Sequence, residues 1–446
     1  MVSDKNILLT TVYKRHKNDI YDYWKANTPE NTFFRYSLPR VNAFGLRFIK
    51  QNLPRIEILE FPSWKEYTKK LDEKNWDIVG FSFYLNEIHE ILEMAEYARQ
   101  QGVSELWAGN YGALTGQIEK NFDKIFYGYS ERKIADYLGW RLKNKEIIHP
   151  PLPGYVSTPH GIKVNSFGYL FTSRGCPYKC KFCQTPSFCP KPSRISLKNI
   201  EKVLKYYRKI GITQVMLLEE NFGTFRKHAD KVVELLDKYN FYWFTMVRAD
   251  YLEKKIDEWT KKGLIGVLTG IENLNQSTLD DISKKEKIND ILSLIRHTKE
   301  YNLMTVGFYM IGFPEETKNS IRKDLKRVGK LDMDITQICV LTPLPKTPLW
   351  DEIDEKYGIF DKNWRHYNAK HLVWNHPNVT PEEMRELLQY GFKVTYPKRR
   401  IFQSGQRFVV NYLKNRGILK GTKYTIKQFI LSNTFNYQPN KKRFLY

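Results

Sequence analysis

The sequence predicts an α/β protein in which an N-terminal Rossmann-like, doubly wound sheet precedes a partial (β/α)6 barrel and a mainly helical, basic C-terminal region. Short apolar strands alternate with helical segments over residues 5–140, the alternation restarts at Tyr169, and no acidic residue follows Glu386. Strands that alternate with helices are typical of parallel sheets. We expect the boundaries 1–140, 141–168 (linker), 169–355 and 356–446.

Cysteine usage and the lengths of the apolar runs argue against a disulfide-stapled protein and against a membrane-spanning one. A chain of 446 residues can form two or three domains with cores of their own. Five cysteines without regular pairing argue against a disulfide framework and for a reducing, cytoplasmic setting. The N-terminus lacks the apolar core of a signal peptide, and no apolar run approaches the ~20 residues of a membrane span. We therefore expect a soluble or peripheral protein.

The N-terminal third reads as strand, helix and strand in turn. One face of the segment Asn86–Gln101 is apolar at helical spacing, which predicts an amphipathic helix. The candidate strands are Ile7–Val12, Ile56–Leu59, Ile78–Phe83, Leu106–Gly109 and Lys124–Phe126. A prolyl stretch, His149–Gly154, cannot extend a helix or a central strand and marks the linker.

Six strands separated by amphipathic segments predict the partial barrel. These strands are Tyr169–Ser173, Gln214–Leu218, Tyr242–Val247, Leu264–Ile271, Thr305–Ile311 and Ile335–Leu341. The segments Leu197–Ile210 and Ala229–Tyr239 are examples of the helices between them. Chemistry in βα barrels lies at the carboxyl ends of the strands, so we expect the site there.

The cysteines Cys176, Cys180 and Cys183 follow the first barrel strand at spacings of four and three. One loop can wrap three such thiols around a small inorganic centre and leave one coordination position open. Three free thiols are the alternative, although chance clustering of three among five cysteines is improbable. Cys189 is a packed cysteine, a substrate-side thiol or an extra ligand, of which we favour the first. Cys339 lies within a strand and reads as core.

The CxxxCxxC spacing resembles the cluster loop of the radical S-adenosylmethionine (radical SAM) enzymes. In that family three cysteines hold a 4Fe–4S cluster and SAM chelates the fourth iron. The resemblance implies both cofactors and an electron donor such as ferredoxin or flavodoxin. It also places the backbone of Phe182 against the adenine of SAM.

The later strand ends continue this resemblance. Glu219 or Glu220 would hold the SAM amino group, unless the pair is an exposed acidic turn, and Arg248 would pair with the SAM carboxylate. Glu272, in Gly-Ile-Glu-Asn, would lie near the ribose. The last two strands contribute Gly312, which permits close backbone approach to a ligand, and Thr342, within a Thr-Pro-Leu-Pro-Lys-Thr-Pro run.

The N-terminal strands resemble a degenerate cobalamin-binding domain, which precedes the barrel in one branch of the radical SAM enzymes. The resemblance rests on Ser82, Gly109-Asn110 and the acidic turn ending at Glu131, while His16 lacks its usual aspartate and glycine neighbours. Cobalamin bound through His16, cobalamin bound without a protein ligand, and a domain that has lost cobalamin all remain open. The domain could also be a Rossmann-like unit that only shapes the substrate cleft.

The last 60 residues hold 13 Lys and Arg, no acid, and recurring aromatic and aliphatic residues. A basic amphipathic helix is typical of an anionic membrane surface. The same composition suits RNA, and an ordinary solvated basic helix is the third interpretation. We favour peripheral association with the inner face of a membrane. From Thr380, an N-cap, we expect a helix to precede this tail.

These features predict an enzyme. By resemblance, a 5′-deoxyadenosyl radical formed from SAM would abstract hydrogen from an unactivated carbon, leading to C-methylation through cobalamin or to carbon–carbon or ring formation without it. The basic tail and an apolar barrel mouth favour a small-molecule lipid or isoprenoid substrate. Modification of RNA or a peptide is one alternative, and a non-catalytic iron–sulfur or redox-sensing module is another.

Overall fold

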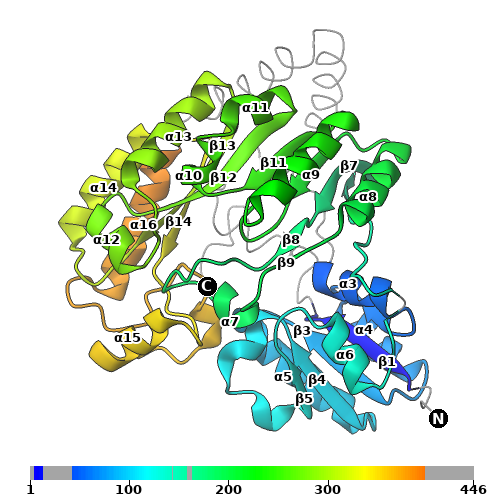
Figure 1. Cartoon of the computed structure of the whole chain (residues 1–446). Coiled ribbons are helices and arrows are strands. Elements are labelled where there is room, and N and C mark those ends of the chain that lie inside the picture. The colour runs from blue at the N-terminus through cyan, green and yellow to red at the C-terminus, as the bar shows by residue number, and fades with distance from the viewer. Residues whose placement is uncertain (1–4, 14–42, 143, 158–162, 397–446) are drawn as a thin grey trace.

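The structure, a computed structural model, describes residues 5–13, 43–142, 144–157 and 163–396, which form two α/β units (Figure 1). The N-terminal unit, blue to cyan, lies against the larger central unit, green to yellow. His16 and the basic tail after Tyr396 lie outside the described residues. Among the described residues, no helix combines the length and apolarity that crossing a membrane requires.

The N-terminal unit is the predicted doubly wound sheet. Its five strands are all parallel, in the order β2-β1-β3-β4-β5. They are β1 (Ile7–Thr11), β2 (Glu57–Leu59), β3 (Ile78–Ser82), β4 (Glu105–Gly109) and β5 (Lys124–Phe126). Helices α3 (Phe44–Asn52) and α6 (Glu131–Tyr137) bury their apolar sides in one core, and α4 (Trp64–Asp72) and α5 (Ile88–Gln100) bury theirs in another. The two cores cover the two faces of the sheet, as buried parallel strands require.

The central unit is built on a seven-stranded sheet of order β14-β13-β12-β11-β10-β7-β6. Six strands run parallel: β7 (Lys163–Leu170), β10 (Gln214–Leu217), β11 (Tyr242–Met246), β12 (Leu264–Glu272), β13 (Met304–Ile311) and β14 (Ile335–Val340). The seventh, β6 (Pro153–Ser157), pairs antiparallel with β7. This hairpin corrects the predicted linker, because Pro153 can begin an edge strand, where its missing N–H is not needed.

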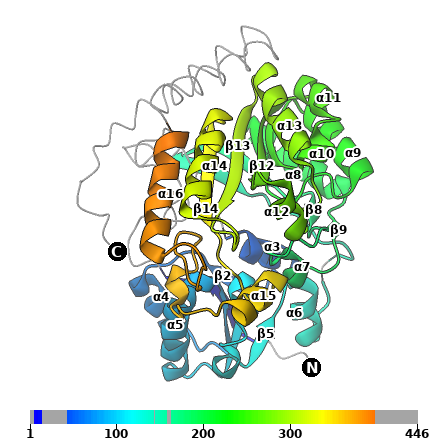
Figure 2. The same cartoon turned by 90° about the vertical axis from the view of Figure 1, so that its left-hand side faces the viewer.

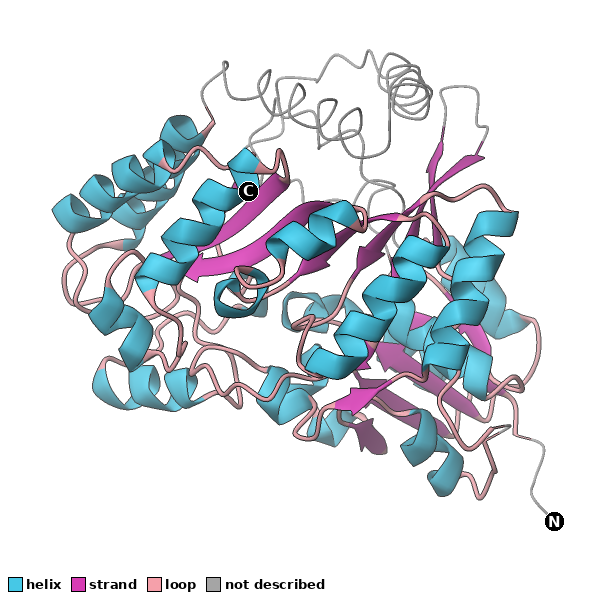
Figure 3. Ribbon diagram, turned by 45° about the horizontal axis from the view of Figure 1, so that its top comes forward, coloured by secondary structure: helices cyan, strands magenta, loops and turns pink. Residues whose placement is uncertain are grey.

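Helices cover one face of this sheet (Figure 3). They are α8 (Leu197–Lys209), α9 (Arg226–Lys238), α10 (Ala249–Leu252), α11 (Ile256–Lys261), α12 (Gln276–Asp281), α13 (Ile288–Glu300) and α14 (Lys318–Lys330). The predicted helix after Thr380 is α16 (Pro381–Thr395), with a capping box between Thr380 and Glu383. It lies beside α14 and β14 (Figure 2). Together these helices close the outer core of the barrel.

The other face of the sheet carries a separate apolar cluster. Its buried members are Tyr242, Phe244, Ile265, Leu268, Met304 and Val306, with Phe167, Met216, Met246, Phe308 and Ile335 packed against them. Every member comes from a strand and none from a helix. Because successive side chains of a strand point to opposite faces, this cluster lines the side turned away from the helices.

Candidate active site

The cysteine loop leaves the short strand β8 (Ser173–Arg174), which pairs with β9 (Ser193–Arg194), and ends at α7 (Thr185–Phe188). Two distant segments hold it. The Lys181 N–H donates to the Ile282 carbonyl (3.0 Å), beyond β12, and the Lys181 carbonyl accepts from the N–H of Leu349 (3.1 Å), in α15 (Pro348–Lys356). The Gln184 side chain donates to the Pro345 carbonyl (2.9 Å). The loop is therefore fixed at the carboxyl ends of the barrel strands.

All three cysteines of the loop are half-buried free thiols. Burial raises the pKa of Cys176 and raises that of Cys180 to about 11, while the cations Arg248 and Lys284 act in the opposite direction. Cationic neighbours favour the thiolate, which is the form that binds metal.

The donor set is three cysteine thiols on one loop, the ligand type that holds iron–sulfur clusters. In the described part of the chain, no group of three or more His, Cys, Asp or Glu side chains is arranged to hold one metal ion. An iron–sulfur cluster instead takes each thiolate on a different iron, so its ligands need not converge on one point.

Glu219 lies buried behind the loop. One of its carboxylate oxygens accepts from the Thr172 N–H (2.9 Å) and hydroxyl (2.6 Å), and the other accepts from the Ser173 hydroxyl. Burial raises the pKa of Glu219 to about 7 despite these hydrogen bonds. The side chain therefore supports the residues that precede the cysteines.

Glu220 points elsewhere, toward the N-terminal unit. It accepts from the Gly175 N–H (3.0 Å), at the start of the cysteine loop, and from the Tyr129 hydroxyl (2.6 Å). Both predicted candidates for the SAM amino group thus have partners within the protein, and that role stays a prediction for each.

Arg248 and Glu272 belong to a buried charge network. Arg248 donates to the carbonyls of Lys284 (2.8 Å) and Lys285 (2.6 Å), and its guanidinium carbon lies 3.8 Å from the centre of the Tyr178 ring. Its fork is therefore engaged by backbone, and its predicted pairing with the SAM carboxylate stays a prediction.

The ammonium of Lys284 joins two carboxylates of this network. It lies 2.9 Å from Glu272 and 3.3 Å from Glu286, and all three side chains are buried. Glu272 adopts a left-handed conformation (φ 58°). Sequence reasoning missed Lys284 and Glu286, because the run Lys-Lys-Glu-Lys at 284–287 has the pattern of an exposed charged loop.

The end of β13 is organised by a carboxylate that was also missed. Glu316 accepts from the N–H groups of Gly312 (2.7 Å) and Phe313 (2.9 Å) and from the Asn273 amide (3.0 Å), which follows β12. Burial raises its pKa to about 7. Gly312 has a φ of 91°, which explains the glycine. A Glu-Thr pair after a Gly-Phe-Pro turn was the available signal.

The remaining predicted residues make local contacts. Thr342 is half-buried and donates to the Val340 carbonyl (3.0 Å). Phe182 is half-buried and packs against the main core. Cys189 donates to the Lys191 carbonyl (3.5 Å), and burial raises the pKa of Cys339, on β14, to about 12.

Loops of the N-terminal unit contact α7, which directly follows the cysteines. The ring of Tyr111, after β4, stacks on Phe188 at 4.1 Å between centres, and its hydroxyl lies 3.4 Å from the Thr185 hydroxyl. A Cβ at Gly128, after β5, would lie 2.3 Å from the Phe188 carbonyl oxygen. Helical and strand periodicity carries no information about such contacts, and the sequence did not predict them.

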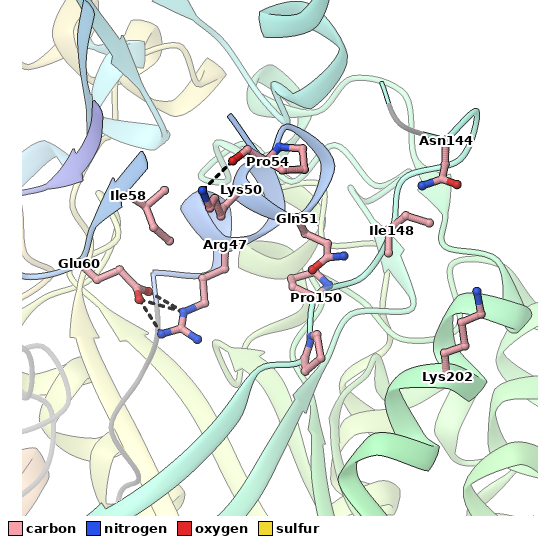
Figure 4. Close-up of a pocket in the computed structure, with 11 residues that line it drawn as sticks. Arg47, Lys50, Gln51, Pro54, Ile58, Glu60, Asn144, Ile148, Pro150 and Lys202 are labelled. Atoms are coloured by element: carbon pink, nitrogen blue, oxygen red, sulfur yellow. Dashed lines mark hydrogen bonds and ion pairs between the residues drawn. The ribbon is translucent and has the colours of Figure 1, made fainter. Parts of the chain in front are cut away.

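A cavity of about 520 Å³ lies between α3, residues 144–151 and α8 (Figure 4). Its Arg47 is paired with Glu60 (2.6 Å), and its Lys50 donates to the Pro54 carbonyl (2.7 Å). No predicted site residue lines it, so it is not the candidate active site.

Comparison with known proteins matches residues 170–328 to the model of the radical SAM superfamily. An uncharacterized methyltransferase of Pyrococcus horikoshii is 26% identical over 387 residues, covering 77% of this chain and 83% of the relative. Bacteriochlorophyllide d C-12(1)-methyltransferase of Chlorobaculum tepidum is 22% identical over 375 residues, covering 77% and 81%.

The fold is also similar to a solved structure. The radical SAM methyltransferase TsrM of Kitasatospora setae, solved with cobalamin and a [4Fe-4S] cluster bound, superposes with a TM-score of 0.66 at 12% identity. The match covers 96% of this chain and 99% of that protein. It confirms the predicted order of a Rossmann-like unit followed by a partial barrel.

Proposed function

We propose that this chain is a radical SAM enzyme that modifies an unactivated carbon of a lipid or isoprenoid substrate, by C-methylation or by closing a carbon–carbon bond or ring. When bound, the 4Fe–4S cluster supplies the electron that cleaves SAM into methionine and a 5′-deoxyadenosyl radical. The protein's own contribution is to bind, orient and exclude water.

Different residues would hold the cluster, bind SAM and orient the SAM-binding carboxylate. Cys176, Cys180 and Cys183 would hold the cluster, on a loop fixed at the strand ends. We place SAM along the rim formed by Glu272, Gly312 and Thr342. The buried Lys284 keeps Glu272 in place through the 2.9 Å ion pair, so the carboxylate is held in one orientation before SAM arrives.

The proposal for the substrate rests on the apolar, helix-free face of the central sheet. Half-buried aromatic and methionine side chains, such as Phe308, Met216 and Met246, lie on the strands whose carboxyl ends carry the cofactor residues. Such a face binds an apolar carbon skeleton by removing it from water, and methionines adapt to irregular shapes. It also keeps water from a reactive radical.

We propose cobalamin as the methyl carrier if the reaction is methylation. The N-terminal unit has the doubly wound sheet of the predicted cobalamin-binding-like domain, and the structurally similar TsrM was solved with cobalamin. Glu131, which carried part of the resemblance, is engaged with Arg174 (2.7 Å). Cobalt content of the anaerobically purified protein decides between methylation and cobalamin-free ring formation.

The test is anaerobic incubation of the reconstituted protein with SAM and dithionite, with and without a membrane lipid extract. We expect 5′-deoxyadenosine whose yield rises with lipid, and a lipid product of altered mass. The variant Cys180→Ala should form neither, whereas Cys189→Ala should behave as wild type. A yield that responds to a tetrapyrrole or to RNA but not to lipid would contradict the substrate class. No 5′-deoxyadenosine under any condition would overturn the enzyme proposal.

We also propose ferredoxin or flavodoxin as electron donor and peripheral contact with an anionic membrane from the cytoplasmic side. The membrane proposal rests on the composition of the tail. Sedimentation with vesicles containing phosphatidylserine, compared at low and high salt, tests it, because screening weakens contacts between surface charges.

A further inference from the structure

A buried ion pair between the two units lies immediately before the cysteine loop. Arg174, two residues before Cys176, is 4% exposed and donates to the two carboxylate oxygens of Glu131 at 2.7 and 3.0 Å. Its guanidinium carbon lies 4.3 Å from the ring centres of both Phe48 and Tyr129. Phe48, Tyr129 and Glu131 all belong to the N-terminal unit, so this cation is enclosed by the neighbouring unit.

A second link reaches the next residue of the loop. The Tyr129 hydroxyl donates to one oxygen of Glu220 (2.6 Å), and the other oxygen accepts from the backbone N–H of Gly175 (3.0 Å). Gly175 has a φ of 79°, and a Cβ there would lie 2.8 Å from the Cys189 sulfur. The backbone of Gly175 therefore lies between Glu220 and Cys189, in a conformation that favours glycine.

The Arg174–Glu131 pair and the hydrogen bonds from Tyr129 and Gly175 to Glu220 together orient the start of the cysteine loop. Charge-assisted bidentate pairs and hydrogen bonds from backbone N–H to a carboxylate are among the more strongly oriented contacts in proteins. Here Glu131 fixes residue 174 from the N-terminal unit, and Glu220, which accepts from Tyr129 of that unit, fixes residue 175, whereas residues 181 and 184 are fixed from within the barrel. Of the three loop cysteines, Cys176 is the nearest in sequence to residues 174 and 175.

We infer that the N-terminal unit positions the cysteine loop, with Glu131 and Tyr129 acting through Arg174 and Glu220 as positioning residues for Cys176. The inference rests on the proposed function, because it takes Cys176 as a cluster ligand. Neither Glu131 nor Tyr129 needs to touch the cluster. The N-terminal unit would then be required for the geometry of the cluster as well as for any cofactor or substrate that it binds.

The test uses the full chain with Tyr129→Phe and, separately, Glu131→Gln. The matched controls are Tyr127→Phe and Glu119→Gln, which remove an exposed pair two residues from Tyr129, with 3.5 Å between hydroxyl and carboxylate. The measurements are iron content, the rate of iron loss to a chelator, and the electron paramagnetic resonance (EPR) spectrum of the reduced cluster. Tyr129→Phe removes one hydrogen bond to Glu220 and keeps the ring on Arg174, so it tests the inference even if Glu131→Gln fails to fold.

We expect Tyr129→Phe to keep its far-UV circular dichroism and its iron, but to lose iron about ten- to a hundredfold faster, as for one hydrogen bond to a charged group. Its EPR spectrum should shift, which a change in stability alone would not cause. The controls should match wild type. If Tyr129→Phe releases iron like the controls with an unchanged spectrum, the inference is wrong, whether or not Glu131→Gln folds. If wild type itself takes up no cluster, the proposed function fails instead.

Discussion

Replacing Lys284 with methionine tests the buried charge network most sharply. Methionine keeps the length of the side chain and removes the ammonium that lies 2.9 Å from Glu272 and 3.3 Å from Glu286. Both carboxylates are then left in the interior, where Glu286 has no exposed side-chain surface. Removing one partner of a buried ion pair costs about 3 to 5 kcal/mol.

The cost should appear in thermal unfolding. A cooperative unit of the size of this barrel melts about 2 to 4 °C lower per kcal/mol, so Lys284→Met should melt about 6 to 20 °C lower than wild type. The assay is an anaerobic thermal melt followed by circular dichroism. The same melt of cluster-free protein separates the effect on folding from the effect on cofactor binding.

The matched control is Lys262→Met. Lys262 also contacts two carboxylates, Glu234 and Glu258, but at the surface of the barrel. Exposed pairs contribute about 0 to 1 kcal/mol, so this variant should melt within about 4 °C of wild type. The double variant Lys284→Met with Glu272→Gln should recover part of the loss, because one uncompensated charge is gone. Equal melting temperatures for Lys284→Met and Lys262→Met would refute the reasoning.

Three further predictions concern neighbouring features. Gly270→Ala should destabilise the barrel, because its Cβ would lie 2.0 Å from the Glu272 carboxylate and 2.6 Å from the Lys284 ammonium; melting temperature measures this, with Gly109→Ala, a strand glycine whose Cβ would meet nothing closer than 3.5 Å, as the control. The pKa of Glu219, raised by burial to about 7, means that the folded state binds its proton more tightly than the unfolded state, so this contribution is complete below pH 4.5 and is lost as pH rises through 7. Glu219→Gln should therefore reduce the fall in melting temperature between pH 5 and 8, and an unchanged slope would contradict the assignment. Cys189→Ala should retain wild-type iron content, and a loss of iron would make Cys189 a ligand.

The sequence predicted the two sheets well because their strands are short apolar runs between amphipathic segments. Ile78–Ser82 and Met304–Ile311 are examples whose ends were placed within one residue. The antiparallel β6 was missed because three prolines between residues 150 and 153 resemble a linker, and only pairing with β7 makes a strand of the segment.

The candidate site was predicted in part, for a physical reason. Cysteine spacing is local, so Cys176, Cys180 and Cys183 could be selected from the chain alone. Glu219 bonds Thr172, Arg248 bonds the Lys284 carbonyl, and Glu272 bonds the Lys284 ammonium, across 47, 36 and 12 residues of sequence, and no periodicity connects these partners. Charged residues such as Lys284 look solvated until the fold shows that they are buried together.

The contact between the units was beyond sequence reasoning for the same reason. Arg174 and Glu131 are 43 residues apart, and each alone has an ordinary exposed-charge pattern. Only the fold brings them together behind the cysteine loop.

The EPR spectrum of the anaerobically reconstituted, reduced protein, recorded with and without SAM, tests the central claim most directly. A radical SAM enzyme should bind about four irons per chain and show a cluster signal that SAM shifts, because SAM chelates the open iron. The signal should be lost in Cys180→Ala and kept in Cys189→Ala. A spectrum that SAM leaves unchanged, or a Cys180→Ala variant with the full cluster signal, would contradict the account.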